Sequence, residues 1–304
     1  MTQRWFFSIA SLLLALPCST AAQSALPKPP AEVRATSPGL FERAIGNQKK
    51  AEEALDVYER IERLETRKNP NDPSPVSVKF ARVIPSGTGM NKIPLDADGK
   101  PPDAAAYRAR LEGLERALAL LVNGARSQRD AVEKYAKRKR DRAELIDATR
   151  NAFLFKFIAQ ETRGELLLTK YEMYPNPAFK PTTRFTVVFP KVHGFVWIDE
   201  NSGELARIEG DVTDDISIGL FLGKIYKGSH FMEERYEVEP GLWLPSFTQF
   251  DFDGRKLFSG FSIHERTFYS DYRYIGPPKE ALEAIRKELG HIDLGKSVAP
   301  TADP

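Results

Sequence analysis

The residues that could carry chemistry are few and widely spaced in this chain. Its four histidines have spacings that put no two of them on one helix face or one strand face: His193, His230, His264 and His291. Zinc needs several such ligands gathered at one point, so this spacing does not favour a metal site. The sequence also has no Gly-x-Ser-x-Gly nucleophile motif and no phosphate-binding glycine loop. We therefore expect no catalytic residues, no metal and no cofactor, and we expect that the protein is not an enzyme.

The N-terminus predicts a secretory signal peptide at residues 1–22. Its apolar segment, "WFFSIASLLLAL", is too short to cross the hydrocarbon core of a bilayer, about 30 Å, and small residues follow it. We expect cleavage near Gln23 and export to the periplasm. Cys18, the only cysteine, lies in this leader, so the mature chain would have no thiol. Cleavage before Cys18 with lipid anchoring there is the alternative, which the neighbouring Pro17 disfavours.

The charge balance limits the classes of partner. The chain has 44 Lys and Arg residues against 42 Asp and Glu residues, and its formal net charge of +2 falls to +1 when Arg4 leaves with the leader. A chain so close to neutral has no global field for nucleic acid or anionic lipid. We therefore expect no nucleic acid as a partner.

The first folded element is expected after a linker. Residues 23–38 are rich in proline and small residues, which is typical of a flexible spacer. From Gly39 the apolar residues recur near helical spacing, which predicts an amphipathic helix that passes into a strand near Tyr58.

Residues 103–150 predict a long helical insertion. Asp103 is its expected N-cap, and Gly124 is an expected bend or break. The basic run at 134–142 has acidic residues beside it, which favours a solvated helix face over a contact with lipid or a partner. Apolar residues repeat at four and three in a stripe that would pack on one neighbour: Tyr107, Leu111, Leu114, Leu118 and Leu121.

After residue 150 the periodicity changes from helical to two, which predicts β-strands. About eight segments follow one another with short turns, an arrangement typical of an antiparallel meander. "TRFTVVFP" at 183–190 is one of these expected strands, Asp253-Gly254 is an expected hairpin turn, and Pro245 predicts an edge or a bulge. A short helix is expected from Pro278, followed by a disordered tail, so that 277–304 forms the C-terminal part.

The first strand of the series is apolar on both faces, so each face needs a cover. One alternative is a dry core between sheet and helices. The other is an apolar cavity that holds a ligand. The candidate cavity residues, all at alternating positions of the expected central strands, are Phe153, Phe155, Phe157, Phe185, Val187, Phe195 and Trp197.

The strand series resembles a known family. Five motifs, in this order and spacing, are similar to the LolA/LolB-like superfamily of bacterial outer-membrane lipoprotein carrier and sorting proteins: "GFVWIDENSGELARIEG", "KIYKGSHF", "PGLWLPS", "GRKLF" and "YSDYR". The resemblance implies an α+β fold, a strongly curved antiparallel β half-barrel covered by helices. Residues 39–276 would form this domain, with 103–150 inserted in it. In carriers of this type, the cavity sequesters acyl chains.

Two hypotheses of different class follow. In the first, an exported envelope protein binds lipid or lipoprotein acyl chains in an apolar cavity, in outer-membrane lipoprotein sorting or lipid transport. In the second, a non-catalytic periplasmic scaffold binds an envelope protein partner through helix 104–150 and its stripe. A carrier should have an apolar cavity, whereas a scaffold should expose the stripe. An envelope enzyme, the third alternative, would gather pKa-shifted groups in a cleft.

Overall fold

The protein is described by a computed structural model over residues 38–183, 185–218 and 223–297. The expected signal peptide with Cys18, the linker up to residue 37 and the tail from residue 298 lie outside the described residues. Among the residues that are described, no helix is long and apolar enough to cross a membrane.

The chain forms two compact units that alternate along the sequence. Of the described residues, unit 1 comprises those in the ranges 38–51, 65–77 and 138–267, and unit 2 comprises those in the ranges 52–64, 78–137 and 268–297. Three elements contribute residues to both units: β1 (Tyr58–Thr66), α3 (Arg129–Ala152) and β12 (Ser259–Tyr274).

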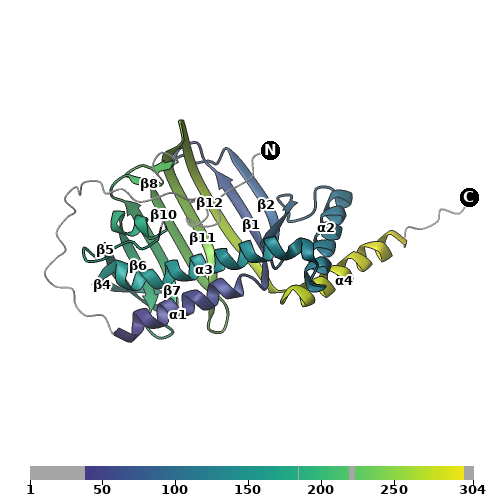
Figure 1. The fold of residues 1–304 in the computed structure, drawn as a ribbon, viewed down its shortest axis with the longest axis horizontal. Coiled ribbons are helices and arrows are strands. Elements are labelled where there is room, and N and C mark those ends of the chain that lie inside the picture. Colours follow the sequence, from purple (N-terminus) through teal and green to yellow (C-terminus); the bar gives the residue numbers. More distant parts are fainter. Residues whose placement is uncertain (1–37, 184, 219–222, 298–304) are drawn as a thin grey trace, which may run out of the picture. The chain divides into compact units, whose positions relative to one another are not determined.

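Unit 1 is a sheet with helices on one face. Helix α1 (Pro38–Ala54) and the C-terminal part of α3 run side by side across the strands (Figure 1). The strand order is β12-β11-β10-β7-β6-β5-β4. The bounds are β4 (Phe153–Arg163), β5 (Leu166–Pro175), β6 (Val192–Asp199), β7 (Leu205–Val212), β10 (His230–Glu239) and β11 (Leu242–Lys256), and the small strands β8 (Ile216–Ile218) and β9 (Gly223–Ile225) lie beside the end of β11.

Unit 2 packs two helices with a smaller group of strands. Its strand order is β3-β2-β1-β12, with β2 (Ser77–Pro85) and β3 (Met90–Leu95). Helices α2 (Ala104–Val122) and α4 (Pro278–Ser297) share a core with these strands, and the 3-10 turn η2 (Arg126–Gln128) follows α2.

The α+β class and the antiparallel strand pairing predicted from the sequence are confirmed. The expected strongly curved half-barrel is not found, because the sheet is open and not strongly curled. Closure needs a strand tilt and register that bring the two edges of a sheet together. In the described part of the chain the strand order ends instead at β3 and β4.

Several local predictions are confirmed. The consecutive strands β6 and β7 pair as an antiparallel hairpin, as the expected meander requires, with Gly203 in the turn at φ +73°. The bulge expected at Pro245 is present, since Arg235 pairs with Pro245 while Glu234 pairs with Phe247. These features depend on local patterns of period two and on turn residues, which a sequence displays directly.

Two strand predictions are wrong. The segment expected as a strand at 183–190 contains instead the 3-10 turn η3 (Thr186–Lys191), which Phe185 precedes and Val187 belongs to. Here the Thr186 hydroxyl accepts hydrogen bonds from the backbone N–H groups of Thr182 (3.2 Å) and Thr183 (3.1 Å). Such side-chain bonds compete with the ladder of a sheet.

The hairpin turn expected at Asp253-Gly254 is also misplaced. Strand β11 continues to Lys256, and the turn is formed by Leu257 and Phe258. Gly254 serves another purpose, because a Cβ there would overlap the carbonyl oxygen of Lys224 on β9. The glycine therefore permits the close approach of a neighbouring strand rather than a turn.

The apolar stripe of α2 is buried rather than exposed. Leu111, Leu114 and Leu118 pack with α4 and the strands of unit 2, and none is more than 2% exposed. Asp103 caps the helix as predicted, and Gly124 follows its end at φ +66°. The stripe is thus not the exposed partner surface that the scaffold hypothesis required. Its partner α4 runs for 20 residues and is longer than the short helix expected.

Candidate functional site

The sheet of unit 1 has an apolar face and a polar face. We call the face covered by α1 and α3 the inner face and the opposite one the outer face. Register places Phe155 and Met173 in one row of the inner face, which continues to Gly194, next to the row of Tyr171, Val196 and Ile208. Apolar residues therefore dominate the inner face, and they form the largest core cluster described in this unit.

Aromatic rings join the inner face to its cover. Phe41 of α1 stacks on Phe155 at a centroid distance of 4.1 Å and meets Tyr171 edge-on at 5.2 Å. Phe153 makes an edge contact of 5.2 Å with Phe189 of η3. Burial raises the pKa of Tyr171 above its usual range, because an apolar surrounding disfavours the phenolate.

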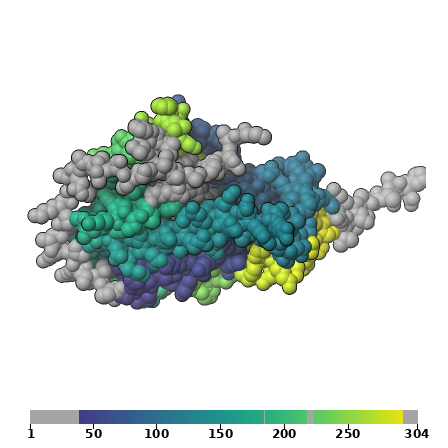
Figure 2. All heavy atoms as spheres, viewed as in Figure 1, coloured from purple at the N-terminus to yellow at the C-terminus, as the bar shows by residue number. Residues whose placement is uncertain are grey.

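Helix α3 contributes few buried side chains to the cover, whereas α1 contributes Leu40 and Ala44 to the core. Of the 24 residues of α3, only Ala152 is buried among those described, while Leu145 and Ala148 are partly buried against the inner face. The two helices are tied to each other by ion pairs of 2.6 Å, Lys49 with Asp147 and Arg150 with Glu42, whose side chains are more than a third exposed. Figure 2 shows α1 (purple) and α3 (teal) as adjoining parts of one surface. Exposed pairs of this kind contribute little to stability, because solvent screens them.

The seven candidate cavity residues do not share one face. Five belong to the inner side: Phe153, Phe155 and Phe157 by strand register, and Phe185 and Val187 by packing in its core cluster. Phe157 lies at the margin, 39% exposed, with its ring 6.3 Å from that of Tyr171. The other two, Phe195 and Trp197, point to the outer face and pack with Leu168, Ala206 and Trp243.

Cations cover the aromatic part of the outer face. The Lys170 ammonium lies 4.5 Å from the ring centroids of both Phe195 and Trp197, and the Arg207 guanidinium lies 4.9 Å from that of Trp197. The indole N–H of Trp197 donates to Glu161 at 3.0 Å. This surface is polar and occupied by its own side chains, so it is unsuited to an acyl chain.

Histidines and aspartates alternate in one row across the outer face. His193, Asp211, His230 and Asp251 are successive Cα partners on β6, β7, β10 and β11. His230 is hydrogen-bonded to Asp211 at 2.8 Å, and His193 is hydrogen-bonded to Glu172 at 3.0 Å. This row could not be predicted from the sequence, because residues on different strands become neighbours only through register. No group of three metal-binding side chains is assembled within the described residues.

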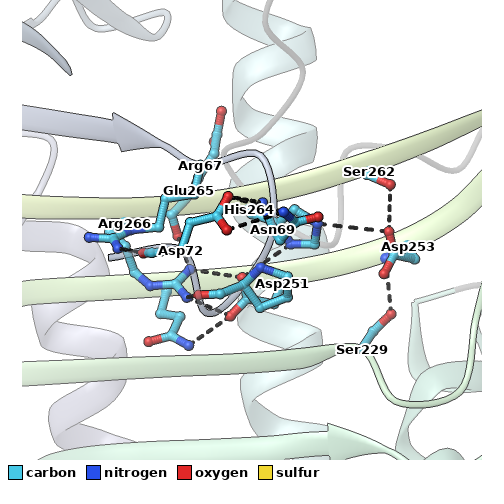
Figure 3. A network of polar contacts seen from close by, with 12 residues as sticks. Arg67, Asn69, Asp72, Ser229, Asp251, Asp253, Ser262, His264, Glu265 and Arg266 are labelled. Carbon is cyan, nitrogen blue, oxygen red and sulfur yellow. Dashed lines mark hydrogen bonds and ion pairs between the residues drawn. The ribbon is translucent and has the colours of Figure 1, made fainter. Parts of the chain in front are cut away.

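A buried polar network extends the row onto β12 (Figure 3). Asp251 accepts two hydrogen bonds from the Arg266 guanidinium, at 2.9 and 2.8 Å, and is bonded to His264 at 3.2 Å. Arg266 also donates to the carbonyl oxygen of Pro70 at 3.1 Å, which ties the loop after β1 to the sheet. All three side chains of the Asp251 cluster are less than a tenth exposed.

This network does not form a nucleophile and base. Ser262 donates its hydroxyl proton to Asp253 at 2.5 Å rather than to His264, whose Nε2 lies 3.9 Å from Asp253. Nucleophilic catalysis by serine requires the hydroxyl to be within hydrogen-bond reach of the base. The hydrogen bonds of the cluster link β11, β12 and the loop after β1.

Unit 2 contains a cleft of about 450 Å³ with a mainly charged lining. The Arg82 guanidinium donates to Glu59 at 2.7 Å and to Glu288 at 2.7 Å, and Arg273 pairs with the other oxygen of Glu59. The lining comprises Glu59, Arg60, Ile61, Arg82, Asp271, Tyr272 and Arg273. An acyl chain finds little apolar surface there.

The ion pairs of this cluster, rather than its burial, determine the direction in which the pKa values shift. Burial by itself would lower the pKa of Arg82, but the bonds to Glu288 and Glu59 outweigh it and raise that pKa. Burial would likewise raise the pKa of Glu288, but Arg82 and then Tyr107 hold it below its usual range. Both groups are therefore charged at neutral pH, and neither is poised for proton transfer there.

No protein-family model matches the chain, and no curated protein sequence does either. Two solved structures are similar to it at low identity. One is a putative outer membrane lipoprotein-sorting protein domain from Vibrio parahaemolyticus, with 12% identity over 77% of this chain and 93% of that one and a TM-score of 0.30. The other is a DUF1329 family protein from Desulfovibrio piger, with 10% identity over 79% and 94% and a TM-score of 0.26. The first of these structures is named for the same class of protein as the resemblance drawn from the sequence.

Proposed function

We propose that this protein is an exported, non-catalytic envelope protein that binds a lipid or a lipoprotein acyl chain between the inner face of unit 1 and its cover of α1 and α3. The observation that carries the proposal is an aromatic sheet face beneath a helix that buries little of its own surface. Phe41, Phe153 and Phe155 provide the apolar surface on which a chain would lie.

The energetics favour exchange of the cover for a ligand. Lifting α3 removes the contacts of Leu145 and Ala148 and exposes Ala152, so only a small apolar area is lost. A bound acyl chain gains about 0.8 kcal/mol for each CH₂ group taken out of water. A segment of several carbons therefore offsets the loss of these contacts, and neither a metal nor a catalytic group is needed.

The predicted signal peptide supports a periplasmic location, where a water-shielded path for acyl chains is useful. Lipoprotein sorting and lipid transport both need such a protein. The chemistry common to both is a saturated or unsaturated chain in an apolar site, and the cargo itself would identify the process.

Native mass spectrometry of the mature protein, followed by lipid extraction of the same sample, tests the proposal. Phe155→Asp places a charge on the inner face, whereas Phe195→Asp places the same charge at a partly buried phenylalanine of the outer face. We expect co-purifying lipid to be lost in Phe155→Asp and retained in Phe195→Asp, with both variants folded by circular dichroism. A wild-type protein that carries no lipid and takes up no added fatty acid or lysophospholipid would refute the proposal.

A further inference from the structure

The turn between β11 and β12 exposes two large apolar side chains to solvent. Phe258 is fully exposed (101%), and its neighbour Leu257 is 48% exposed. Single apolar residues are common on protein surfaces. Here two adjacent apolar residues lie at the end of a hairpin whose strands have 15 and 16 residues.

The backbone of this turn is strained. Leu257 has φ +54°, in the left-handed region where a Cβ crowds the following carbonyl group. Two-residue hairpin turns usually place glycine, asparagine or aspartate at such a position. A leucine there makes the turn less stable than a glycine would, so the turn itself does not account for the residue. Strain of this kind is commonly kept at positions with a function.

A third strand pairs with the hairpin beside the exposed pair. Strand β9 pairs with β11 up to the last residue before the turn, with Gly254 opposite Ile225 and Lys256 opposite Gly223. A Cβ at Gly254 would also overlap the ring of Phe261, so the two strands of the hairpin are closely packed there. Leu257 and Phe258 are therefore held in place by a third strand.

The residues around the turn are basic. Arg255 and Lys256 are exposed, and within the described part of the chain neither takes part in an ion pair. The sequence has no acidic residue from Gly254 to His264. Two free cations thus stand beside two exposed apolar side chains. We call residues 255–258 the hairpin tip.

We propose that the hairpin tip docks on the surface of an anionic lipid bilayer. Phe258 and Leu257 enter the boundary between headgroups and acyl chains, and Arg255 and Lys256 pair with lipid phosphates. A specific protein interface buries about 800 Å² on each partner, which two side chains cannot supply. A bilayer, in contrast, accepts a small apolar wedge flanked by cations. This inference goes beyond the proposed ligand site and uses none of its residues.

Sedimentation of the mature protein with lipid vesicles tests the inference. We expect binding to vesicles that contain phosphatidylglycerol and about tenfold weaker binding to vesicles of phosphatidylcholine alone, because each basic residue near an anionic surface adds to the attraction. Phe258→Ser should lower binding to the anionic vesicles about tenfold. Leu257→Gly should lower the binding as well while raising the urea midpoint, since it relieves the strain.

Matched variants separate this docking from other effects. Leu120→Ser, at a leucine of α2 that is 45% exposed, should leave vesicle binding unchanged. Phe155→Asp should also keep it, so that failure of the ligand site and failure of the docking site are distinguishable. Absence of binding to anionic vesicles would overturn the inference, and so would unchanged binding in Phe258→Ser. If Phe258→Ser instead dissociated a dimer in analytical ultracentrifugation, the tip would be an interface between two copies and the inference would be wrong.

Discussion

Phe41 of α1 stacks on Phe155 of β4, with the two ring planes inclined by only 28°. This contact links the covering helix to the inner face, and Leu40, Ala44, Leu145 and Ala148 add further apolar contacts beside the exposed ion pairs. The strength of the cover therefore depends on a few apolar contacts, which makes its removal a measurable step.

Phe41→Ala should loosen this cover. We expect the free energy of unfolding to fall by roughly 2 kcal/mol, less than for a fully buried phenylalanine, and the uptake of an apolar fluorescent probe to become faster. Phe157→Ala, at the exposed margin of the same face, should change stability by about 1 kcal/mol or less. Urea denaturation and stopped-flow fluorescence measure the two effects. Slower probe uptake in Phe41→Ala would argue against entry beneath α1.

Hydrogen exchange of the wild-type protein should show that the covering helix α3 opens more readily than the sheet. The amides of α3 at 138–152 should exchange earlier than those of β6, because α3 buries only Ala152 whereas Val196 and Ile198 of β6 are 5% and 1% exposed. Added lipid should slow the exchange of α3 selectively. Exchange of α3 and β6 at one common rate would mean that the cover opens only with the whole unit.

The sequence predicted the strands well where the period-two pattern alone determines the structure. In β6, Val196 and Ile198 pack on one face and Phe195 and Trp197 on the other, as period-two alternation requires. The sequence could not decide which face receives the helices, because both faces carry apolar residues. For this reason the candidate cavity residues include two, Phe195 and Trp197, that lie on the outer face.

Long-range proximity explains the remaining errors. Asp253-Gly254 has the composition of a hairpin turn, but the approach of β9 gives Gly254 a different purpose. The row from His193 to Asp251 depends on the register of four strands, and a single bulge changes register. Neither fact is encoded within a short window of sequence.

Gly194→Ala should destabilise unit 1. Gly194 on β6 lies opposite Gly210 on β7, and a Cβ at Gly194 would overlap the carbonyl oxygen of Glu209. Because this obstacle is backbone, relief requires a shift of the strand, and we expect a loss of about 1 to 3 kcal/mol. Gly260→Ala is the control, since its nearest neighbour would be 3.8 Å away. Equal midpoints of the two variants in thermal unfolding would contradict the close approach.

Glu204→Gln should stabilise the protein at neutral pH. Burial raises the pKa of Glu204 above its usual range, and the nearby charges of Arg235 and Lys50 only partly oppose this. The folded state then binds the proton more tightly than the unfolded state, so stability decreases as pH rises from about 4.5 through the folded pKa. Glutamine has no charge to bury, and we expect a gain on the order of 1 kcal/mol at pH 7 and none at pH 4. Denaturation at both pH values checks this, and a loss at pH 7 would show that the carboxylate is needed.

The contribution of Glu288 to the stability of unit 2 should change with pH in the opposite direction to that of Glu204. Arg82 and Tyr107 hold the pKa of this carboxyl below its ordinary value of 4.5, so the folded state favours the carboxylate. Its contribution to stability is then fully present above about pH 4.5 and is lost as the pH falls through the folded pKa. Glu288→Gln should cost about 1 to 2 kcal/mol at pH 7, because Arg82 keeps Glu59 as a partner, and much less at pH 3. Glu283→Gln, on the exposed side of α4, should have little effect at either pH. If the loss in Glu288→Gln were the same at pH 3 and pH 7, packing rather than charge would hold α4 in place.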